Sequence, residues 1–251
     1  MIDNCSPARD NWIDHLWGFG PRLRDRRKAV SAFSKDFPVR ANVYIDGFNF
    51  YYRAVSRTRY KWLNYRQMVE LAYKDHEIGH IRYFTARVKP KEAQGDNPVD
   101  HSKVDRQTVY LRALCTIPNF SIHYGKFQTH AARRPLVVPL DDGTKYVEIQ
   151  DTKEKGSDVN LASHLLMDGF NKSYQLAIVI TNDSDLAEPI RMVRDCLGLP
   201  VNVLDPQSKV SKQLRNACTD YQNLRTWMLE KSQFPDSLTD KNGVITKPKE
   251  W

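Results

Sequence analysis

Short apolar runs alternate with amphipathic segments along most of this chain. Runs such as Leu176–Ile180, which have no polar interruption, are typical of strands buried on both faces of a parallel sheet. The pattern predicts five strands, at residues 41–46, 80–87, 120–127, 176–180 and 200–205. Helices are predicted between or after them, within residues 62–75, 104–115, 159–170, 188–195 and 208–218. This alternation predicts an α/β fold, with a mostly parallel five-stranded sheet and helices on both of its faces.

One region departs from this alternation. Two strand-like segments, residues 136–140 and 145–149, flank Asp141-Asp142-Gly143. An Asp-Gly turn between such segments is a strong hairpin signal. We therefore expect a β-hairpin insertion that lies beside the main sheet.

The chain divides into three parts by composition. We predict an N-terminal extension at residues 1–40, a main domain at 41–220 and a C-terminal tail at 221–251, which turns polar and poor in structure from Phe234. Trp12 and Trp17 offer large apolar surfaces, so we expect them to pack on the domain or on a second subunit, which leaves a homo-oligomer open. The basic segment 22–28 is open to two interpretations, a nucleic-acid contact or a strap docked on the domain.

Aspartates occur where the predicted strands end. Asp46 ends the first strand, and Asp183 and Asp185 follow the fourth, while Asp158 begins a helix. Because parallel strands share one carboxyl edge, these side chains are expected on the same edge of the sheet, where open α/β sheets bind ligands. The alternative is that single aspartates only cap helices or start turns. Asp205 also ends a strand, but Asp-Pro is a routine turn starter, so it is left out of the predicted site.

Clustered carboxylates indicate a metal. Without a cation they repel one another and their pKa values rise, whereas a divalent ion neutralises them. Oxygen ligands without His or Cys favour Mg²⁺ or Mn²⁺ over zinc. Such an ion can activate water and stabilise the leaving oxygen in phosphodiester hydrolysis.

Charge agrees with a polyanionic partner. Lys and Arg outnumber Asp and Glu by 38 to 30, which gives a net charge of +8. No apolar run is long enough for a membrane span and the N-terminus lacks the core of a signal peptide, so we expect a cytoplasmic protein that does not contact membranes. Cys115 and Cys196 lie in apolar helical patterns and are expected to be buried thiols.

Three motifs occur in order: Val43-Tyr-Ile-Asp-Gly-Phe-Asn49, Glu154-Lys-Gly-Ser-Asp-Val-Asn-Leu-Ala162 and Ile180-Thr-Asn-Asp-Ser-Asp-Leu186. Together they resemble the NYN domain family, the LabA-like branch of the PIN-like nuclease superfamily. The resemblance covers residues from about 41 to 220 and implies a PIN-like three-layer α/β/α fold with metal-dependent ribonuclease activity. It also implies an acidic site formed by Asp46, Asp158, Asp183 and Asp185, with Asn49 beside them. Some family members have Asp at the position of His164.

The chemistry of these side chains suggests individual roles. Asp46, Asp158 and Asp183 are expected to bind the metal directly, and Asp185 directly or through water. Two further groups are expected to orient water or contact the phosphate of RNA, with DNA a possible substrate: Asn49 and Asn182, and the lysines Lys126, Lys153 and Lys155. The asparagines are equally good turn residues, and the lysines equally good solvated side chains.

Three other functions remain in view. His76-Glu-Ile-Gly-His80 matches the zinc-protease pattern. However, Gly79 and the strand expected near His80 interrupt the helix that the pattern needs. We therefore expect no metal there and interpret His76 and His80 as surface histidines at a helix end. A non-catalytic RNA-binding or scaffolding module is the main alternative to the ribonuclease. A DNA-directed nuclease would use the same metal chemistry.

Overall fold

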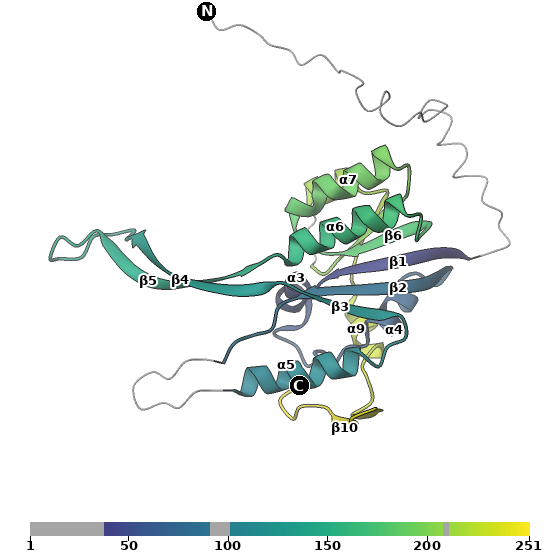
Figure 1. The fold of residues 1–251 in the computed structure, drawn as a ribbon, viewed down its shortest axis with the longest axis horizontal. Coiled ribbons are helices and arrows are strands. Elements are labelled where there is room, and N and C mark those ends of the chain that lie inside the picture. Colours follow the sequence, from purple (N-terminus) through teal and green to yellow (C-terminus); the bar gives the residue numbers. More distant parts are fainter. Residues whose placement is uncertain (1–37, 91–100, 208–210) are drawn as a thin grey trace, which may run out of the picture. The chain divides into compact units, whose positions relative to one another are not determined.

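The computed structural model describes residues 38–90, 101–207 and 211–251. A six-stranded sheet in the order β3-β2-β1-β6-β7-β8 forms its centre, and every neighbouring pair of strands is parallel (Figure 1). Its strands are β1 (Val39–Asp46), β2 (His76–Thr85), β3 (Phe120–Tyr124), β6 (Leu176–Ile180), β7 (Val201–Asp205) and β8 (Asp220–Asn223). The predicted α/β class and mostly parallel sheet are confirmed.

Helices cover both faces of this sheet, as the unbroken apolar strands require. All five residues of β6 are buried, so this strand packs on both sides. One apolar cluster includes side chains of α3 (Gly47–Phe50), η2 (Tyr51–Val55), α4 (Tyr65–Ala72), α5 (Ser102–Leu114) and α9 (Thr226–Lys231). The other includes side chains of α6 (Ser157–Phe170), α7 (Ala187–Cys196) and α8 (Lys212–Ala217). The result is three layers, α/β/α (Figure 1).

The strand order reverses at the centre of the sheet. From β1 the chain moves outward through β2 and β3, and it then returns to the other side of β1 as β6 and continues to β8. Loops that leave β1 and β6 therefore diverge to opposite sides, which opens a crevice at their carboxyl ends. Asp46 ends β1 at this point, and Asp183 follows β6.

The C-terminal region is more structured than expected. Residues 221–251 complete β8 and form α9, β9 (Ser237–Asp240) and β10 (Gly243–Thr246), so the expectation of a tail poor in structure is wrong. The expectation of only five strands is also wrong, because β8 adds a sixth. The sequence of these segments is mostly polar, because each adds only isolated apolar side chains to a core that other elements build. Examples are Phe234, Ile245 and Trp251. The Trp251 ring, for example, lies 5.3 Å from that of Tyr110.

The predicted hairpin is present, but its strands lie elsewhere than expected: residues 136–140 form no strand, and of residues 145–149 only 146–149 belong to one. The strands β4 (Lys126–Pro135) and β5 (Tyr146–Lys155) pair antiparallel from Lys126–Lys155 to Pro135–Tyr146. They form a separate two-stranded ribbon that projects away from the main sheet (Figure 1). The predicted third strand, residues 120–127, accordingly divides at Gly125 into β3 and the start of β4. A Cβ on Gly125 would lie 2.6 Å from the carbonyl oxygen of Lys155, so the close approach of the two strands at the base of the ribbon requires glycine here.

One local expectation near the sheet is also wrong. Strand β2 begins at His76, so both histidines of the zinc-protease pattern lie on a strand and not at a helix end. On the neighbouring strand, Gly47 follows the last residue of β1 and begins helix α3. Its missing side chain accommodates β2, because a Cβ there would lie 2.7 Å from the carbonyl oxygen of Phe84.

The cysteines differ from expectation as well. Cys115, which follows the last residue of α5, and Cys196, the last residue of α7, are exposed, whereas Cys218 is buried. The predicted packing of Trp12 and Trp17 lies outside the described residues. Within the described part of the chain, no helix has both the length and the apolar character needed to cross a membrane.

Candidate active site

Three carboxylates meet where the strand order reverses. Asp46 comes from the end of β1, Asp183 from the turn after β6, and Asp158 from the first turn of α6. Each contributes a carboxylate oxygen, and these oxygens all lie within 4.8 Å of one another. We call these residues the acidic triad. Among the residues that the structure describes, no other group of His, Cys, Asp or Glu side chains is gathered in this way.

Backbone and hydroxyl donors hold Asp46 in place. The Asn49 amide donates to Oδ1 of Asp46 at 3.1 Å, which caps α3, and the Thr181 hydroxyl donates to Oδ2 at 3.0 Å. The same Thr181 oxygen accepts the amide hydrogen of Asp183 at 3.0 Å. Thr181 is fully buried, so it connects two members of the acidic triad through a rigid part of the fold.

The two predicted asparagines are linked to each other. The Asn182 amide donates to Oδ1 of Asn49 at 3.0 Å, which ties the loop after β6 to helix α3. The side chain of Asn182 donates instead to Asp205 at 2.5 Å. Asp205 is completely buried and also accepts hydrogen bonds from the Tyr221 hydroxyl and the Gln207 amide. Asp205, which we left out of the predicted site, therefore orients the loop that carries Asp183.

Burial and mutual repulsion both act on the triad. Burial and the nearby Asp158 and Asp183 carboxylates together raise the pKa of Asp46 to about 7, although the hydrogen bonds from Asn49 and Thr181 act in the opposite direction. Burial also raises the pKa of Asp158, followed by the charges of Asp183, Glu154 and Asp185. No Lys or Arg of the described residues forms an ion pair with the triad. A bound cation would remove this repulsion.

The donor set fits a hard divalent cation. Its three members are carboxylates, with no His or Cys among them, and Asn49 is the neutral neighbour. Oxygen-only donors of this kind suit Mg²⁺ or Mn²⁺. The triad therefore has the composition, the proximity and the excess negative charge that such an ion would need.

A cleft of about 420 Å³ opens over the triad. Two of its walls come from outside the carboxyl edge of the sheet: α3 with η2, and the base of the ribbon. The residues that line it are Asp46, Phe48, Asn49, Tyr52, Arg53, Phe127, Glu154, Ser157, Asp158 and Asp183. Acidic, aromatic and cationic side chains thus share one cavity.

Comparison with known proteins identifies the fold's relatives. A family model described as NYN domain matches residues 40–225, most of the chain. The chain belongs to the NYN domain family. The LabA-like, PIN-like assignment suggested by the three motifs is consistent with this family.

Two individual proteins are also similar to this NYN protein. It is 28% identical, over 246 aligned residues, to 6-hydroxy-3-succinoylpyridine 3-monooxygenase HspA of Pseudomonas putida (strain DSM 28022 / S16), an alignment that covers 85% of this chain and 76% of the relative. A crystal structure of a protein of unknown function, VPA0982 from Vibrio parahaemolyticus RIMD 2210633, aligns with 15% identity and a TM-score of 0.49. That alignment covers 77% of this chain and 98% of the other.

The remaining predicted site residues of the NYN domain lie outside the triad. Asp185 is exposed, and its amide donates to Oδ1 of Asp183 at 3.0 Å, but its carboxylate is not gathered with the other three. It adds negative charge near Asp158. Its role as a metal ligand, direct or through water, stays a prediction.

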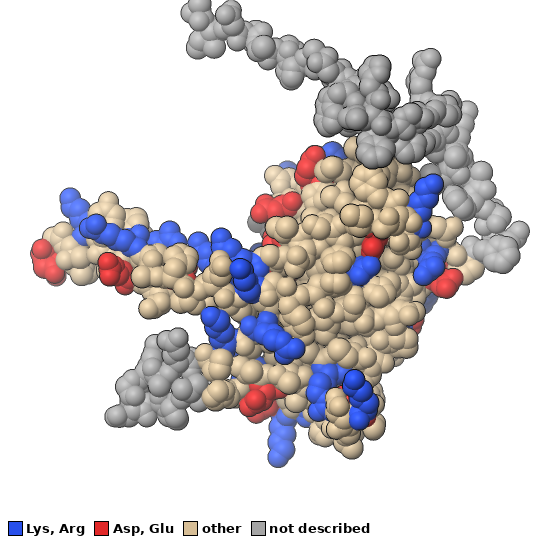
Figure 2. Space-filling model, viewed as in Figure 1, with Lys and Arg blue, Asp and Glu red and all other residues tan. Residues whose placement is uncertain are grey.

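The three predicted lysines lie on the ribbon. Phe127 and Glu154 are paired across its base and both line the cleft. Since side chains alternate along a strand, Lys126, Lys153 and Lys155 point to the opposite face. Figure 2 shows Lys and Arg side chains spread along the ribbon. The predicted phosphate contacts of these lysines therefore remain predictions and require a substrate that passes around the edge of the ribbon.

Several residues of the site were not identified from the sequence. Glu154 was inside a quoted motif, and it accepts hydrogen bonds from the amide and the hydroxyl of Ser157, which fixes the start of α6 beside Asp158. Thr181 was also within a motif. Arg53, Tyr52 and Phe127 carry no sequence signal, because only the folded chain brings α3, η2 and the ribbon together.

Two histidine expectations can be placed in the structure. His80 donates or accepts a hydrogen bond with Ser121 at 2.8 Å and lies away from the triad, and no zinc-type cluster involves His76 or His80 among the described residues. The His164 ring, where some family members have Asp, lies 4.1 Å from the ring of His123. The His164 side chain therefore lies beside His123 and is not directed toward the carboxylates that surround Asp158.

Proposed function

We propose that this NYN domain hydrolyses RNA phosphodiester bonds with Mg²⁺ or Mn²⁺ bound by Asp46, Asp158 and Asp183. The observation that carries the proposal is the acidic triad itself: three carboxylates within 4.8 Å, without an internal cation, in an open cleft at the reversal of strand order. Membership in the NYN family, which indicates a nuclease, supports the same chemistry.

The residues of the site have distinct tasks in this proposal. A divalent ion, when bound, supplies activation of water and stabilisation of the leaving oxygen. Asp46, Asp158 and Asp183 hold it, while Thr181 and the Asn49 amide keep Asp46 in the orientation seen here. Because Oδ1 of Asn49 is occupied by the Asn182 amide, its Nδ2 group is directed to water or to a phosphate oxygen.

The test is cleavage of labelled RNA and of single-stranded DNA with the same base sequence, each with Mg²⁺, Mn²⁺ or a chelator. We expect divalent-dependent cleavage of RNA, and a loss of more than about 100-fold in Asp46→Asn, Asp158→Asn and Asp183→Asn, since each removes a charged ligand. Glu188→Gln is the matched control, because it removes a surface carboxylate of α7 that pairs with Arg191. Full cleavage by Asp46→Asn would defeat the assignment of the site, and preferential cleavage of DNA would favour a DNA-directed nuclease.

The same experiment separates the ribonuclease from a non-catalytic RNA-binding module. Binding to RNA depends largely on Lys and Arg contacts with phosphate, and it weakens as salt increases. A catalytic protein should therefore retain binding in Asp46→Asn while losing cleavage. Wild-type protein that binds RNA but cleaves none of several substrates with either metal would favour the module.

One observation favours a second candidate function, the binding of a small heteroaromatic acid. The cleft combines the aromatic side chains Phe48, Tyr52 and Phe127 with the cation of Arg53. The name of the HspA relative describes action on 6-hydroxy-3-succinoylpyridine. Calorimetric titration with this compound is the direct test. Saturable binding that Arg53→Gln abolishes, in a protein without nuclease activity, would favour this candidate over the ribonuclease.

A further inference from the structure

The cleft of the acidic triad has an aromatic side as well. Phe48 comes from α3, Tyr52 from η2 and Phe127 from the start of β4 at the base of the ribbon, and all three line the same cavity as the triad. The Phe48 and Phe127 rings lie 5.6 Å apart at 71°, an edge-to-face contact that holds the base of the ribbon against α3. We call these three residues the aromatic wall.

The aromatic wall is not an ordinary part of the core. Tyr52 is 68% exposed, although its neighbour Tyr51 contacts it edge-to-face at 5.2 Å. Neither Phe48 nor Phe127 belongs to the two apolar clusters that cover the sheet. Exposed aromatic rings that border a cavity next to charged groups are typical of a surface that stacks on a planar ligand.

The backbone of this region has an unusual form. Residues Tyr51–Val55 are a π-helix, closed by a 2.8 Å hydrogen bond from the Ser56 amide to the Tyr51 carbonyl. Single π-turns are rare and occur frequently at functional sites. Here the π-turn follows α3 directly and places Tyr52 and Arg53 along the cleft.

Arg53 supplies the charge that the triad lacks for binding a phosphate. Its side chain is exposed, lines the cleft and forms no ion pair with any described residue. Every other charged side chain that lines the cleft is negative. An unpaired arginine is well suited to bind phosphate, since its planar guanidinium presents several donors.

We propose that Phe48, Tyr52 and Phe127 form a nucleobase-stacking subsite beside the acidic triad, and that Arg53 contacts the adjacent phosphate. This inference rests on the proposed function, because it takes the ligand to be a nucleic acid strand. The cleft volume of about 420 Å³ is near the lower end of the range for small-ligand pockets, roughly 300–1,000 Å³, which suits one nucleotide and not a duplex. A paired base has both faces covered by its neighbours, so the subsite selects an unpaired nucleotide at the point of cleavage.

The ribbon then has a defined part in recognition. Phe127 is the second residue of β4, and its partner Glu154 in β5 lies in the same cleft. The insertion therefore completes the subsite at its base.

The test is binding, measured apart from cleavage. The protein is the full-length Asp46→Asn variant, alone or combined with one further substitution: Tyr52→Ala, Tyr52→Phe, Phe127→Ala or Arg53→Gln. Each protein is titrated with fluorescein-labelled single-stranded RNA and with a blunt duplex of the same sequence. One stacked base contributes about 1–3 kcal/mol, so Tyr52→Ala and Phe127→Ala should weaken single-strand binding by roughly 5- to 150-fold. Tyr52→Phe should restore it, and duplex binding should be unchanged.

Two controls separate stacking from charge and from general damage. Tyr146→Ala removes an exposed tyrosine at the other end of the ribbon, which contacts Arg133 at 4.6 Å and lies outside the cleft, and it should leave binding unchanged. Arg53→Gln should reduce the slope of log K against log salt by about one, because one phosphate contact is lost. Tyr52→Ala should leave that slope unchanged. Quenching of a 2-aminopurine base in the strand, lost in Tyr52→Ala, reports stacking directly.

The outcomes distinguish this inference from the proposed function. Single-strand binding that is unchanged by Tyr52→Ala, or reduced equally by Tyr146→Ala, overturns the stacking subsite even if the triad cleaves RNA. Selective loss with Tyr52→Ala and recovery with Tyr52→Phe support it even if no cleavage is found. Because Tyr52 is exposed, its variants test the inference independently of any effect of Phe127→Ala on the ribbon.

Discussion

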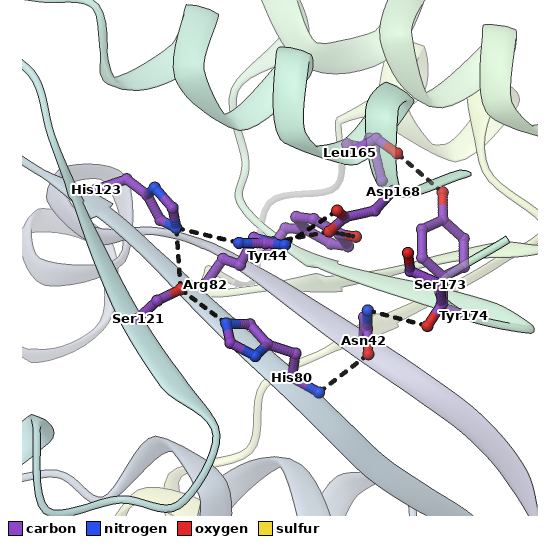
Figure 3. Close-up of polar contacts among 10 residues, drawn as sticks. All are labelled: Asn42, Tyr44, His80, Arg82, Ser121, His123, Leu165, Asp168, Ser173 and Tyr174. Atoms are coloured by element: carbon purple, nitrogen blue, oxygen red, sulfur yellow. Dashed lines mark hydrogen bonds and ion pairs between the residues drawn. The ribbon is translucent and has the colours of Figure 1, made fainter. Parts of the chain in front are cut away.

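Helix α6 carries two partly or fully buried aspartates whose surroundings are opposite. Near its carboxyl end, Asp168 accepts hydrogen bonds from Nε and Nη2 of Arg82 at 2.7 and 3.0 Å, and from the Tyr44 hydroxyl at 2.7 Å (Figure 3). In its first turn, Asp158 faces two further carboxylates, Asp46 and Asp183, and no cation of the described residues. The same side chain on one helix thus has a full set of donors at one end and only like charges at the other.

The difference shows how to distinguish a structural carboxylate from a functional one. The Arg82–Asp168 pair connects β2 to α6 and continues through His123 and Ser121 to His80, a chain of contacts within the protein (Figure 3). It needs nothing from outside. The acidic triad is stabilised by hydrogen bonds to Asp46 but keeps a surplus of negative charge, which an external cation would neutralise.

Breaking the internal pair should give the largest change in stability. Arg82→Met leaves the buried Asp168 without its cation, and we expect a loss of roughly 3–5 kcal/mol in the free energy of unfolding. Arg191→Met is the matched control, since it breaks the exposed Arg191–Glu188 pair and should cost less than about 1 kcal/mol. Urea denaturation at pH 7 measures both. Equal losses for the two variants would remove the contrast between Asp168 and the triad.

Removing charge from the triad should instead increase the free energy of unfolding of metal-free protein. The pKa of Asp46 is about 7 in the folded state against 3.8 for an unperturbed aspartate, so the folded state binds more protons than the unfolded state between these values. Its contribution to stability is therefore present below about pH 4 and lost as pH rises toward 7. At 1.36 kcal/mol per pKa unit, the free energy of unfolding of Asp46→Asn should exceed that of wild type by roughly 2–4 kcal/mol at pH 8.

Chemical denaturation with a chelator, at a series of pH values, measures this difference. The advantage of Asp46→Asn should shrink to near zero at pH 4. An advantage that is independent of pH would show that it comes from packing and not from the charge of Asp46.

Metal binding should sharpen the comparison further. A ligand at 100 times its dissociation constant stabilises the folded state by about 2.7 kcal/mol, so saturating Mg²⁺ or Mn²⁺ should raise the melting temperature of wild type. Asp46→Asn should show little of this increase, while Arg191→Met should show all of it. Thermal scans with and without the metal provide the measurement, and an equal increase in Asp46→Asn would place the metal elsewhere.

The smallest expected effect concerns His164, which lies between the two regions on α6. Burial, followed by the neighbouring His164, lowers the pKa of His123 to about 4. His164→Asp places a carboxylate close to His123 and should raise its pKa by roughly 1–3 units. The metal affinity of the triad should stay unchanged, because position 164 is directed toward His123. NMR titration of His123 tests this, with His164→Asn as the uncharged control.

The sequence determined the parts of the fold in which local pattern and tertiary environment agree. The apolar runs of β1, β6 and β7 are buried as expected, because strands covered on both faces consist mainly of apolar residues. Asp46 and Asp183 were predicted together because parallel strands place their carboxyl ends on one edge. Asp158 could be added from its motif and its helix start.

Only the tertiary structure decided the rest. Polar segments such as β8 and the ribbon are stabilised by pairing with other strands, which leaves no apolar periodicity in their own residues. Tyr52, Arg53 and Phe127 reach the cleft because α3, η2 and an antiparallel insertion converge there, and the lysines of that insertion face away because side chains alternate along a strand. The pairing of Asp168 with Arg82 was equally absent from local pattern, since contacts between residues far apart in the chain form only when the sheet and α6 are packed together.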